Sequence, residues 1–241
     1  MTNFALLNNV DHKEVRIITE HSARYRDNVM FSMIFPHEFR DIQACYPILF
    51  HRDASDNFYP LALFGFKEKE NLFLDETGWN ADYVPAMIRR EPFLIGSQES
   101  KEGGDAELAR VLSLDTDHPR VSTEKGERLF QPLGGRTPYL EKVADLMEAI
   151  FLGYEQNKAF VAALQEHDLV ESVNFDITLN DGSKNQLLGF YTINEEKLQE
   201  LPGSTLESFS KAGFLMPIFM AVASMSNMRT LIDLRNIQLE E

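Results

Sequence analysis

The clearest alternation of apolar and polar positions lies near the C-terminal third of the chain. Val170 to Leu179 alternates, Asp181-Gly182 has the composition of a two-residue type I′ turn, and Asn185 to Ile193 alternates again. Closing the segment at that turn brings two apolar pairs face to face: Val173 with Phe190 and Phe175 with Leu188. The pattern therefore predicts an antiparallel β-hairpin with one buried face.

Strands are also indicated in the first third of the chain. Ile48 to Arg52 and Tyr59 to Phe66 are rich in bulky apolar residues, and the polar residues 53–57 between them have turn composition. We expect a third strand over residues 71–74. Short connections of this kind favour antiparallel pairing over βαβ crossovers.

Two long segments have the periodicity of helices. Residues 138–167 predict a long middle helix, or a helix pair broken near Gly153. Residues from about 206 to 234 predict an apolar, methionine-rich C-terminal helix. Methionine-rich faces fill irregular cores or serve as adaptable binding surfaces, and we expect Met225 and Met228 to be the exposed pair.

These elements together predict the fold class α+β. An antiparallel sheet would pack against helices, including the long middle helix and the apolar C-terminal helix. We expect a single domain over residues 1–241. The pair Gly134-Gly135 marks a lobe boundary, so this domain would divide into two lobes joined near residues 131–137.

A block of rigid and charged residues follows the third predicted strand. It holds the only tryptophan of the chain, Trp79, then Tyr83, and it ends in the doubled arginine Arg89-Arg90. With Asp82 as the N-cap of a short helix, both arginines fall in its last turn, where the helix dipole favours cations.

This block supplies the best candidate for a binding site. Two guanidiniums with aromatic neighbours can hold a carboxylate, a phosphate or the acidic loop of a protein partner, so we predict Trp79, Tyr83, Arg89 and Arg90 as the site residues. In the alternative, one arginine pairs with a local carboxylate and the other neutralises the helix end. An acidic protein offers many internal partners of that kind.

A second cluster, Asp115, Asp117 and His118, places three metal-ligand types within four residues. A calcium loop of the EF-hand kind fails, because its glycine and glutamate positions hold Arg120 and Gly126. A transition-metal site would need a further ligand from elsewhere. We expect a solvated loop here, with no metal and no cofactor, and no complete catalytic motif occurs in the chain.

Composition narrows the choice of partners. With 44% hydrophobic and 25% charged residues, the chain is typical of a globular protein with a core. The net charge of −15 would repel a phosphate backbone, so nucleic acid is a poor partner and a protein or peptide is a better one.

The sequence also indicates a compartment. The single cysteine, Cys45, cannot form an internal disulfide, and the N-terminus lacks the features of an export signal. The most apolar segment, residues 212–223, is shorter than the roughly 20 residues that span a bilayer. We therefore expect a soluble cytoplasmic protein without membrane insertion.

The order of these segments resembles the bacterial SapC family. The resemblance covers nearly the whole chain, and it rests on these residues: Glu38-Phe39, Tyr46–Phe50, Pro60, Leu63–Gly65, Asn71–Phe73, Trp79, Tyr83–Pro85, Arg89-Arg90, Pro92-Phe93, Gly126–Phe130, Tyr139-Leu140, Leu198, Leu201 and Gly213–Asn227. It implies an association with surface layers or with outer-membrane uptake and modification systems. It implies no reaction and no catalytic residue. The permease of the same name differs, since it is polytopic.

Three functional hypotheses follow. The first is a non-enzymatic accessory or binding protein that recognises its partner through the four predicted site residues. The second is a metal-dependent enzyme acting on a peptide or small molecule, with His118, Asp115 or Asp117 in its site. The third is a structural subunit that forms homo-oligomers through the methionine-rich C-terminal helix.

Overall fold

The computed structural model describes residues 3–100 and 107–240. The chain forms two compact units: a first unit of residues 1–27 and 86–152, and a second unit of residues 28–85 and 153–241. Antiparallel sheets and helices make up the described structure, so the predicted α+β class is confirmed. The predicted lobe junction near residues 131–137 lies inside the first unit.

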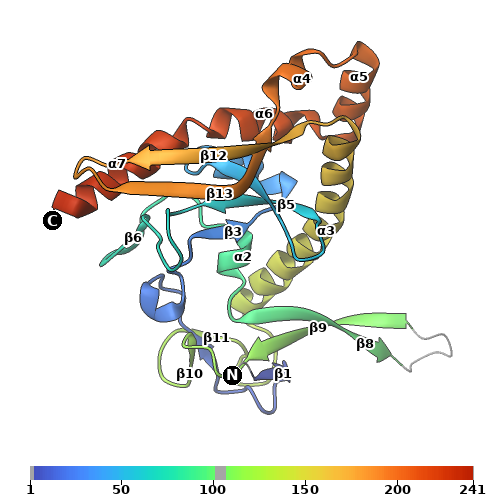
Figure 1. Cartoon of the computed structure of the whole chain (residues 1–241). Helices are drawn as coiled ribbons and strands as arrows, with labels where there is room; N and C mark the ends of the chain where they lie inside the picture. Colours follow the sequence, from blue (N-terminus) through green and yellow to red (C-terminus); the bar gives the residue numbers. More distant parts are fainter. Residues whose placement is uncertain (1–2, 101–106, 241) are drawn as a thin grey trace. The chain divides into compact units, whose positions relative to one another are not determined.

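The second unit is built on a five-stranded antiparallel sheet. Its strand order is β12-β13-β4-β5-β3, and the orange hairpin β12–β13 ends it (Figure 1). The bounds are Phe31–Met33 for β3, Ile48–Arg52 for β4, Phe58–Leu63 for β5, Val170–Thr178 for β12 and Lys184–Ile193 for β13. The structure confirms the strands predicted on either side of the 53–57 turn and in the C-terminal third of the chain. Bulky apolar residues on these strands fill the core.

The strand predicted over residues 71–74 is wrong. Asn71 accepts the backbone N–H of Phe73 at 3.0 Å, which bends the chain into a turn. Only Leu74–Asp75 is extended, as β6, and it pairs with β7, Gly78–Trp79. This hydrogen bond between the asparagine side chain and the backbone favours a turn, and it therefore shortens the strand.

The predicted hairpin forms with a different turn. Gly182 has a φ of +82°, but Asp181 does not share the positive φ that a type I′ turn requires at both positions. The N–H of Gly182 donates to the Leu179 carbonyl at 3.0 Å, and the N–H of Leu179 donates to the Ser183 carbonyl at 2.9 Å. The loop is therefore of the longer kind, in which a turn is followed by a left-handed glycine.

The register of this hairpin is only partly as predicted. Val173 pairs with Phe190 as expected, but Phe175 pairs with Leu187 and not with Leu188, because the register shifts by one residue after Val173. The shift buries Leu187 and leaves Leu188 exposed.

Helices complete the second unit. They are the 3₁₀ turn η2 (Pro36–Glu38), α1 (Phe39–Ile42), α4 (Glu195–Gln199), α5 (Gly203–Ala212), α6 (Leu215–Ser224) and α7 (Asn227–Glu240). The predicted C-terminal helix is present, but residues 206–234 divide among α5, α6 and α7 and do not form one uninterrupted helix. Gly213 ends α5 with a φ of +76°, a conformation that glycine adopts without steric cost.

One side of α6 and α7 packs against the sheet. The Ser224 hydroxyl accepts a hydrogen bond from the backbone N–H of Ile48 on β4 at 2.8 Å. Leu231, further along the chain on α7, is fully buried. Met228 shares this face and is buried, and Met225 is half-buried, so the expectation that they form an exposed pair is wrong. Met216 is exposed instead.

Residues 215–240 have the length and composition of a membrane-spanning helix. Their most apolar window has a mean hydropathy of 1.3, and a third of that window is buried. This run is longer than the 212–223 segment considered in the sequence. Core helices of globular proteins have the same properties, and here Ser224 and Leu231 contact the core of the unit.

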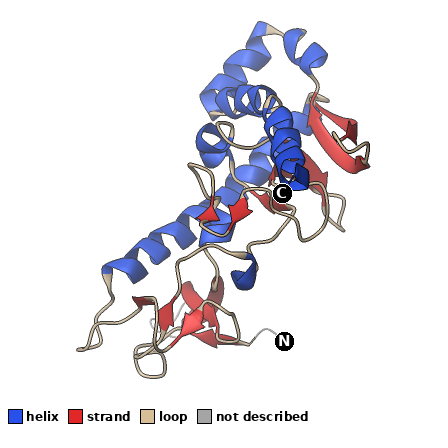
Figure 2. Cartoon of the chain, turned by 90° about the vertical axis from the view of Figure 1, so that its left-hand side faces the viewer, coloured by secondary structure: helices blue, strands red, loops and turns tan. Residues whose placement is uncertain are grey.

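The first unit contains short strands joined by loops (Figure 2). One sheet has the order β1-β9-β8 and the other β10-β2-β11, both antiparallel. The bounds are Phe4–Leu6 for β1, Arg16–Ile17 for β2, Phe93–Ser100 for β8, Glu107–Asp115 for β9, Val121–Ser122 for β10 and Glu127–Arg128 for β11. The 3₁₀ turn η1 (Ala23–Tyr25) and the short helix α2 (Ala86–Arg89) also belong to this unit.

The long middle helix is continuous as α3, Pro138–Glu166. It does not break at Gly153, although glycine is a poor helix former. A Cβ at this position would lie 2.5 Å from Cγ of the buried Phe35 ring. Gly153 is therefore placed where the helix and this ring approach closely, and not where the helix ends.

Gly153→Ala tests this explanation. Alanine is the better helix former, but its methyl group would overlap the Phe35 ring, so we expect a loss of roughly 1–3 kcal/mol in the free energy of unfolding. Urea denaturation measures it. The control is Gly203→Ala at the start of α5, where a Cβ has nothing within 4 Å and the change should stay within about 0.5 kcal/mol. Equal effects of the two substitutions would show that Gly153 has no packing role.

Candidate functional site

Trp79 and Tyr83 direct their polar atoms into the second unit. The indole Nε1 of Trp79 donates to the Tyr46 hydroxyl at 2.7 Å, and that hydroxyl donates to the backbone carbonyl of Tyr83 at 2.5 Å. The Tyr83 hydroxyl donates to the buried Glu38 at 2.8 Å. Burial raises the pKa of Tyr46, which keeps this phenol protonated as a donor. Both predicted site residues therefore take part in an internal network.

Arg89 and Arg90 belong to the first unit and differ in their surroundings. Arg90 is half-buried, donates to the Phe93 carbonyl at 2.9 Å and pairs with Glu91 at 3.0 Å. Arg89 is exposed at the end of α2. Arg90 thus has the local carboxylate partner of the alternative interpretation. Trp79 and Tyr83 lie in the other unit, so a joint site of the four residues stays a prediction.

The helix is shorter than predicted: it carries Arg89, whereas Arg90 follows its last residue and lies in a turn, so only one of the two arginines is in the last turn of the helix. It begins at Ala86, after Pro85, and not at an Asp82 N-cap. The backbone carbonyl of Tyr83 accepts the Tyr46 hydroxyl, so a tertiary hydrogen bond holds this residue outside the helix. Local capping rules could not anticipate that contact.

The cluster of Asp115, Asp117 and His118 does not converge. Asp115 is buried and accepts the backbone N–H groups of Asn3 and Asp117, at 3.1 and 3.2 Å. Asp117 is exposed, whereas His118 is buried. The solvated loop that we expected is therefore wrong for two of the three residues. Within residues 3–100 and 107–240, no three His, Cys, Asp or Glu side chains are placed to hold a metal ion.

The ring of His118 is fixed as the neutral imidazole. Its Nδ1 accepts the backbone N–H of Arg120 at 3.2 Å, so the proton resides on Nε2, which faces Glu91 at 3.7 Å. Burial, together with the charges of Arg26 and Arg120, lowers the pKa of His118 to about 4. His118 therefore remains uncharged at neutral pH.

A buried ion pair lies beside this ring. Nη2 of Arg120 donates to both carboxylate oxygens of Asp27, at 2.8 and 2.7 Å, and both side chains are almost fully buried. Nη1 of Arg120 donates to the carbonyls of Ile18 and Glu20, at 2.9 and 2.6 Å. Nε of Arg120 makes no hydrogen bond within the described residues. The hydrogen bonds of Arg120 thus hold the segment between β2 and η1 in place.

The carboxylate of Asp27 stays ionised despite its burial. Burial alone would raise its pKa, but the hydrogen bond with His21 and the charge of Arg120 outweigh that effect and lower the pKa below its usual value. His21 lies 3.3 Å from Asp27. The charge of Arg120 is therefore largely balanced inside the unit.

A cavity of about 320 Å³ adjoins this ion pair, and we call it the Arg120 cavity. Three cationic side chains line it, from three different segments: Arg89, Arg120 and Lys142. The other lining residues are Ile18, Thr19, His21, Ile88, Glu91, Tyr139, Val143 and Leu146. Such a concentration of positive charge is notable in a chain with a net charge of −15.

Helix α3 contributes one face to the Arg120 cavity. Tyr139, Lys142, Val143 and Leu146 recur at spacings of three and four residues, so they share one side of the helix. Burial raises the pKa of Tyr139 to about 12, so its hydroxyl remains a hydrogen-bond donor at neutral pH. Lys142 is exposed and makes no ion pair within the part of the chain that the structure describes.

Glu91 is the acidic group among the described lining residues. Burial is the largest influence on it and raises its pKa, although Arg90 opposes this effect. Glu91 therefore takes up a proton at a higher pH than an exposed glutamate. As the pH falls, the cavity loses this negative charge and becomes more favourable for an anion.

Sequence reasoning identified Arg89 but missed Arg120, Asp27 and Lys142. Asp27 and Arg120 are 93 positions apart, and no local spacing reveals such a pair. Lys142 did carry a signal, because it stands on the same helical face as the apolar Val143 and Leu146. A lysine beside the apolar positions of an amphipathic helix is a candidate site residue.

His118→Asn tests the neutral state of this ring. Unfolded His118 takes up a proton near pH 6.5 and the folded ring only near pH 4, so the unfolded state binds more protons in this interval. Stability must therefore fall as the pH is lowered through it, by roughly 3 kcal/mol from this residue. Asparagine retains an acceptor for the Arg120 N–H. Urea denaturation between pH 6.5 and 4 should show a shallower loss in the variant, and identical slopes would contradict the buried neutral imidazole.

Comparison with known proteins places the chain in a family. A family model described as SapC matches residues 7–231 of the 241-residue chain. Searches of curated proteins and of solved structures found no match. The family match extends over segments of both units, including α2, α3 and the turn that carries Arg120. The chain therefore belongs to the SapC family.

Proposed function

We propose that this chain is a non-enzymatic binding protein of the SapC family that captures an anionic group of a peptide or protein partner in the Arg120 cavity. The observation that carries the proposal is the convergence of Arg89, Arg120 and Lys142 on one cavity. Guanidinium and ammonium groups bind carboxylates and phosphates through charge-assisted hydrogen bonds.

The three cations have different parts in this proposal. Asp27 holds Arg120 in place and balances its charge, so Arg120 provides a fixed wall. Arg89 and Lys142 are exposed and within reach of a partner. These two side chains carry the exposed positive charges of the cavity, and Arg120 supplies rigidity.

The apolar lining strengthens the attraction. Ile18, Ile88 and Val143 border the cavity and exclude water from part of it. Electrostatic interactions are stronger where water is excluded. A cavity of this kind favours an anionic group attached to an apolar portion, such as an acidic side chain of a peptide.

The biological setting follows from the family resemblance. It links the protein to surface-layer or outer-membrane uptake and modification systems, in which an accessory protein would bind a peptide or protein component. The net charge of −15 is unfavourable for nucleic acid. We place this binding in the cytoplasm, with neither a cofactor nor a membrane-inserted segment.

Anion binding can be measured by isothermal titration calorimetry with two probes, a hexaglutamate peptide and inorganic phosphate. We expect the wild-type protein to bind at least one probe at low ionic strength, and salt to weaken the binding. The double variant Arg89→Ala, Lys142→Ala should bind at least about tenfold more weakly, since it loses two charge-assisted contacts.

The matched control is the double variant Arg24→Ala, Lys125→Ala. It removes the same two charge types from exposed positions of the first unit that do not line the cavity. Its affinity should stay within about twofold of wild type, because distant exposed charges are screened. Equal losses in both double variants, or no binding of either probe by the wild-type protein, would contradict the proposed function.

One observation favours a second candidate function, a subunit that forms homo-oligomers. Met216 and Phe219 on α6 are 52% and 51% exposed, and they border a cavity of about 650 Å³ within the second unit. Exposed apolar side chains grouped on one helix are typical of interaction surfaces. Phe219→Ser should then shift the protein toward monomer in light scattering, and a wild-type monomer at high concentration would contradict this candidate.

A further inference from the structure

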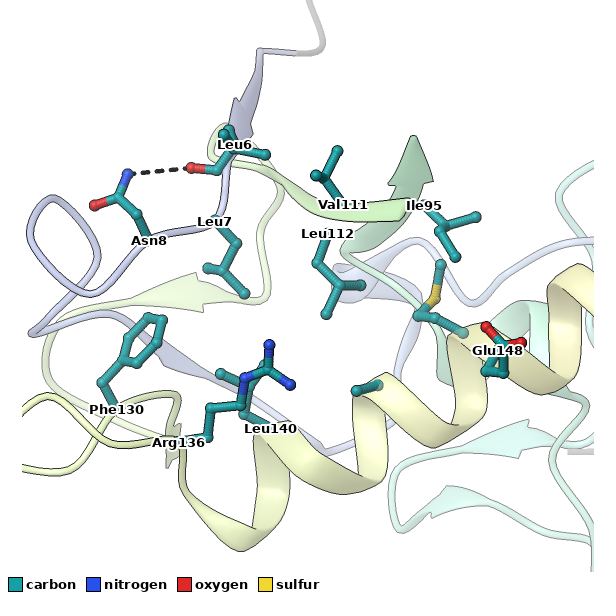
Figure 3. Close-up of a pocket in the computed structure, with 12 residues that line it drawn as sticks. Leu6, Leu7, Asn8, Ile95, Val111, Leu112, Phe130, Arg136, Leu140 and Glu148 are labelled. Atoms are coloured by element: carbon teal, nitrogen blue, oxygen red, sulfur yellow. Dashed lines mark hydrogen bonds between the residues drawn. The ribbon is translucent and has the colours of Figure 1, made fainter. Parts of the chain in front are cut away.

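The first unit contains a second cavity on a different face of α3. It measures about 400 Å³ and lies between the β1-β9-β8 sheet and the helix (Figure 3). We call it the Arg136 cavity. Its helix residues include Leu140, Ala144 and Met147, which share a face distinct from that of Lys142 and Val143.

Nine of the twelve residues that line the Arg136 cavity are apolar. Its main apolar side chains come from the exit of β1, from β8 and β9, from the loop after β11 and from α3: Leu7, Ile95, Leu112, Phe130, Leu140 and Met147. Leu6 at the rim is 47% exposed although it is a large apolar residue. Methionine adapts its shape to a guest, so Met147 suits a wall that must fit a flexible chain. This lining favours a ligand with an apolar body.

Three polar side chains line the same space, and they differ in what they can still bind. Asn8 is saturated, because its Oδ1 accepts the N–H groups of Val10 and Asp11 and its Nδ2 donates to Asp11 and to the Leu6 carbonyl, the last shown dashed in Figure 3. Glu148 has a partner of its own within the molecule. Asn8 therefore offers nothing to a ligand.

Arg136 is the polar group presented to the cavity. Its backbone is fixed, since Gln131 donates to its carbonyl at 2.9 Å and it bridges Phe130 across the loop. Figure 3 shows its guanidinium projecting among Leu7, Leu112 and Leu140. Within residues 3–100 and 107–240, this guanidinium makes no hydrogen bond and no ion pair. A cation beside an apolar wall calls for an anionic group on the ligand.

From this arrangement we propose that the Arg136 cavity binds a medium-chain fatty acid, with the carboxylate paired to Arg136 and the chain against the apolar wall. A peptide fits less well, because Asn8 is saturated and cannot pair with the amides of a peptide. The volume suits a small ligand.

The test is calorimetric titration of the full chain with decanoate below its micelle concentration, with decanol as the probe that lacks the charge. Wild-type protein should bind decanoate at least about tenfold more tightly than decanol, because only decanoate pairs with Arg136. Arg136→Ala should remove that difference. Arg24→Ala, which changes another exposed arginine outside the cavity, should preserve it.

A second variant separates the cavity from the charge. Ala144→Phe places a bulky ring where decanoate would lie and leaves Arg136 intact, so we expect binding to be lost while a thermal melt still shows a cooperative transition. The Arg89→Ala, Lys142→Ala variant of the other cavity should bind decanoate as wild type does. No binding by wild type, equal affinity for decanol, or loss of decanoate binding in the Arg89→Ala, Lys142→Ala variant would overturn the proposal.

Discussion

The buried pairing of Arg120 with Asp27 is the interaction on which the first unit depends. Both charges are withdrawn from water, which is favourable only because the carboxylate meets the guanidinium at 2.7 and 2.8 Å and two backbone carbonyls occupy the remaining terminal N–H groups. Loss of either partner would leave an uncompensated charge in the interior, at a cost of roughly 3–5 kcal/mol. The pair therefore joins the N-terminal segment to the turn before β10 and fixes one wall of the Arg120 cavity.

In the second unit, hydrogen bonds between neutral groups join segments that are distant in the sequence. Tyr46 is fully buried, and its ring packs edge-on against Phe64 and Phe73, with centroids 5.1 and 4.7 Å apart. Its hydroxyl connects the indole of Trp79 to the backbone of Tyr83. The aromatic residues that distinguish the sequence thus organise an interior. The same features that make aromatic residues suitable for recognition, a large apolar body with one polar atom, make them suitable for such a network.

The sequence predicted those features that depend on neighbours along the chain. Alternation located β12 and β13, and helical periodicity located α3. It failed where distant residues decide. The close approach of the Phe35 ring accounts for the glycine at position 153, and the hydrogen bond from the Tyr46 hydroxyl accounts for the late start of α2. Ser224, which bonds to β4, lies at the end of α6, where local patterns predicted one continuous helix. Of the residues that line the Arg120 cavity, Arg89 could be predicted because it is one of two consecutive arginines. Arg120 could not, because its role depends on the distant Asp27.

The proposed anion receptor, the Arg120 cavity, has the Arg120–Asp27 pair as its rigid wall. NMR observation of arginine and lysine side chains during titration with hexaglutamate tests it most directly. We expect saturable shifts for Arg89 and Lys142, while the guanidinium of Arg120 keeps the signature of its pairing with Asp27. Shifts confined to cations outside the cavity, or release of Arg120 from Asp27 on binding, would contradict it.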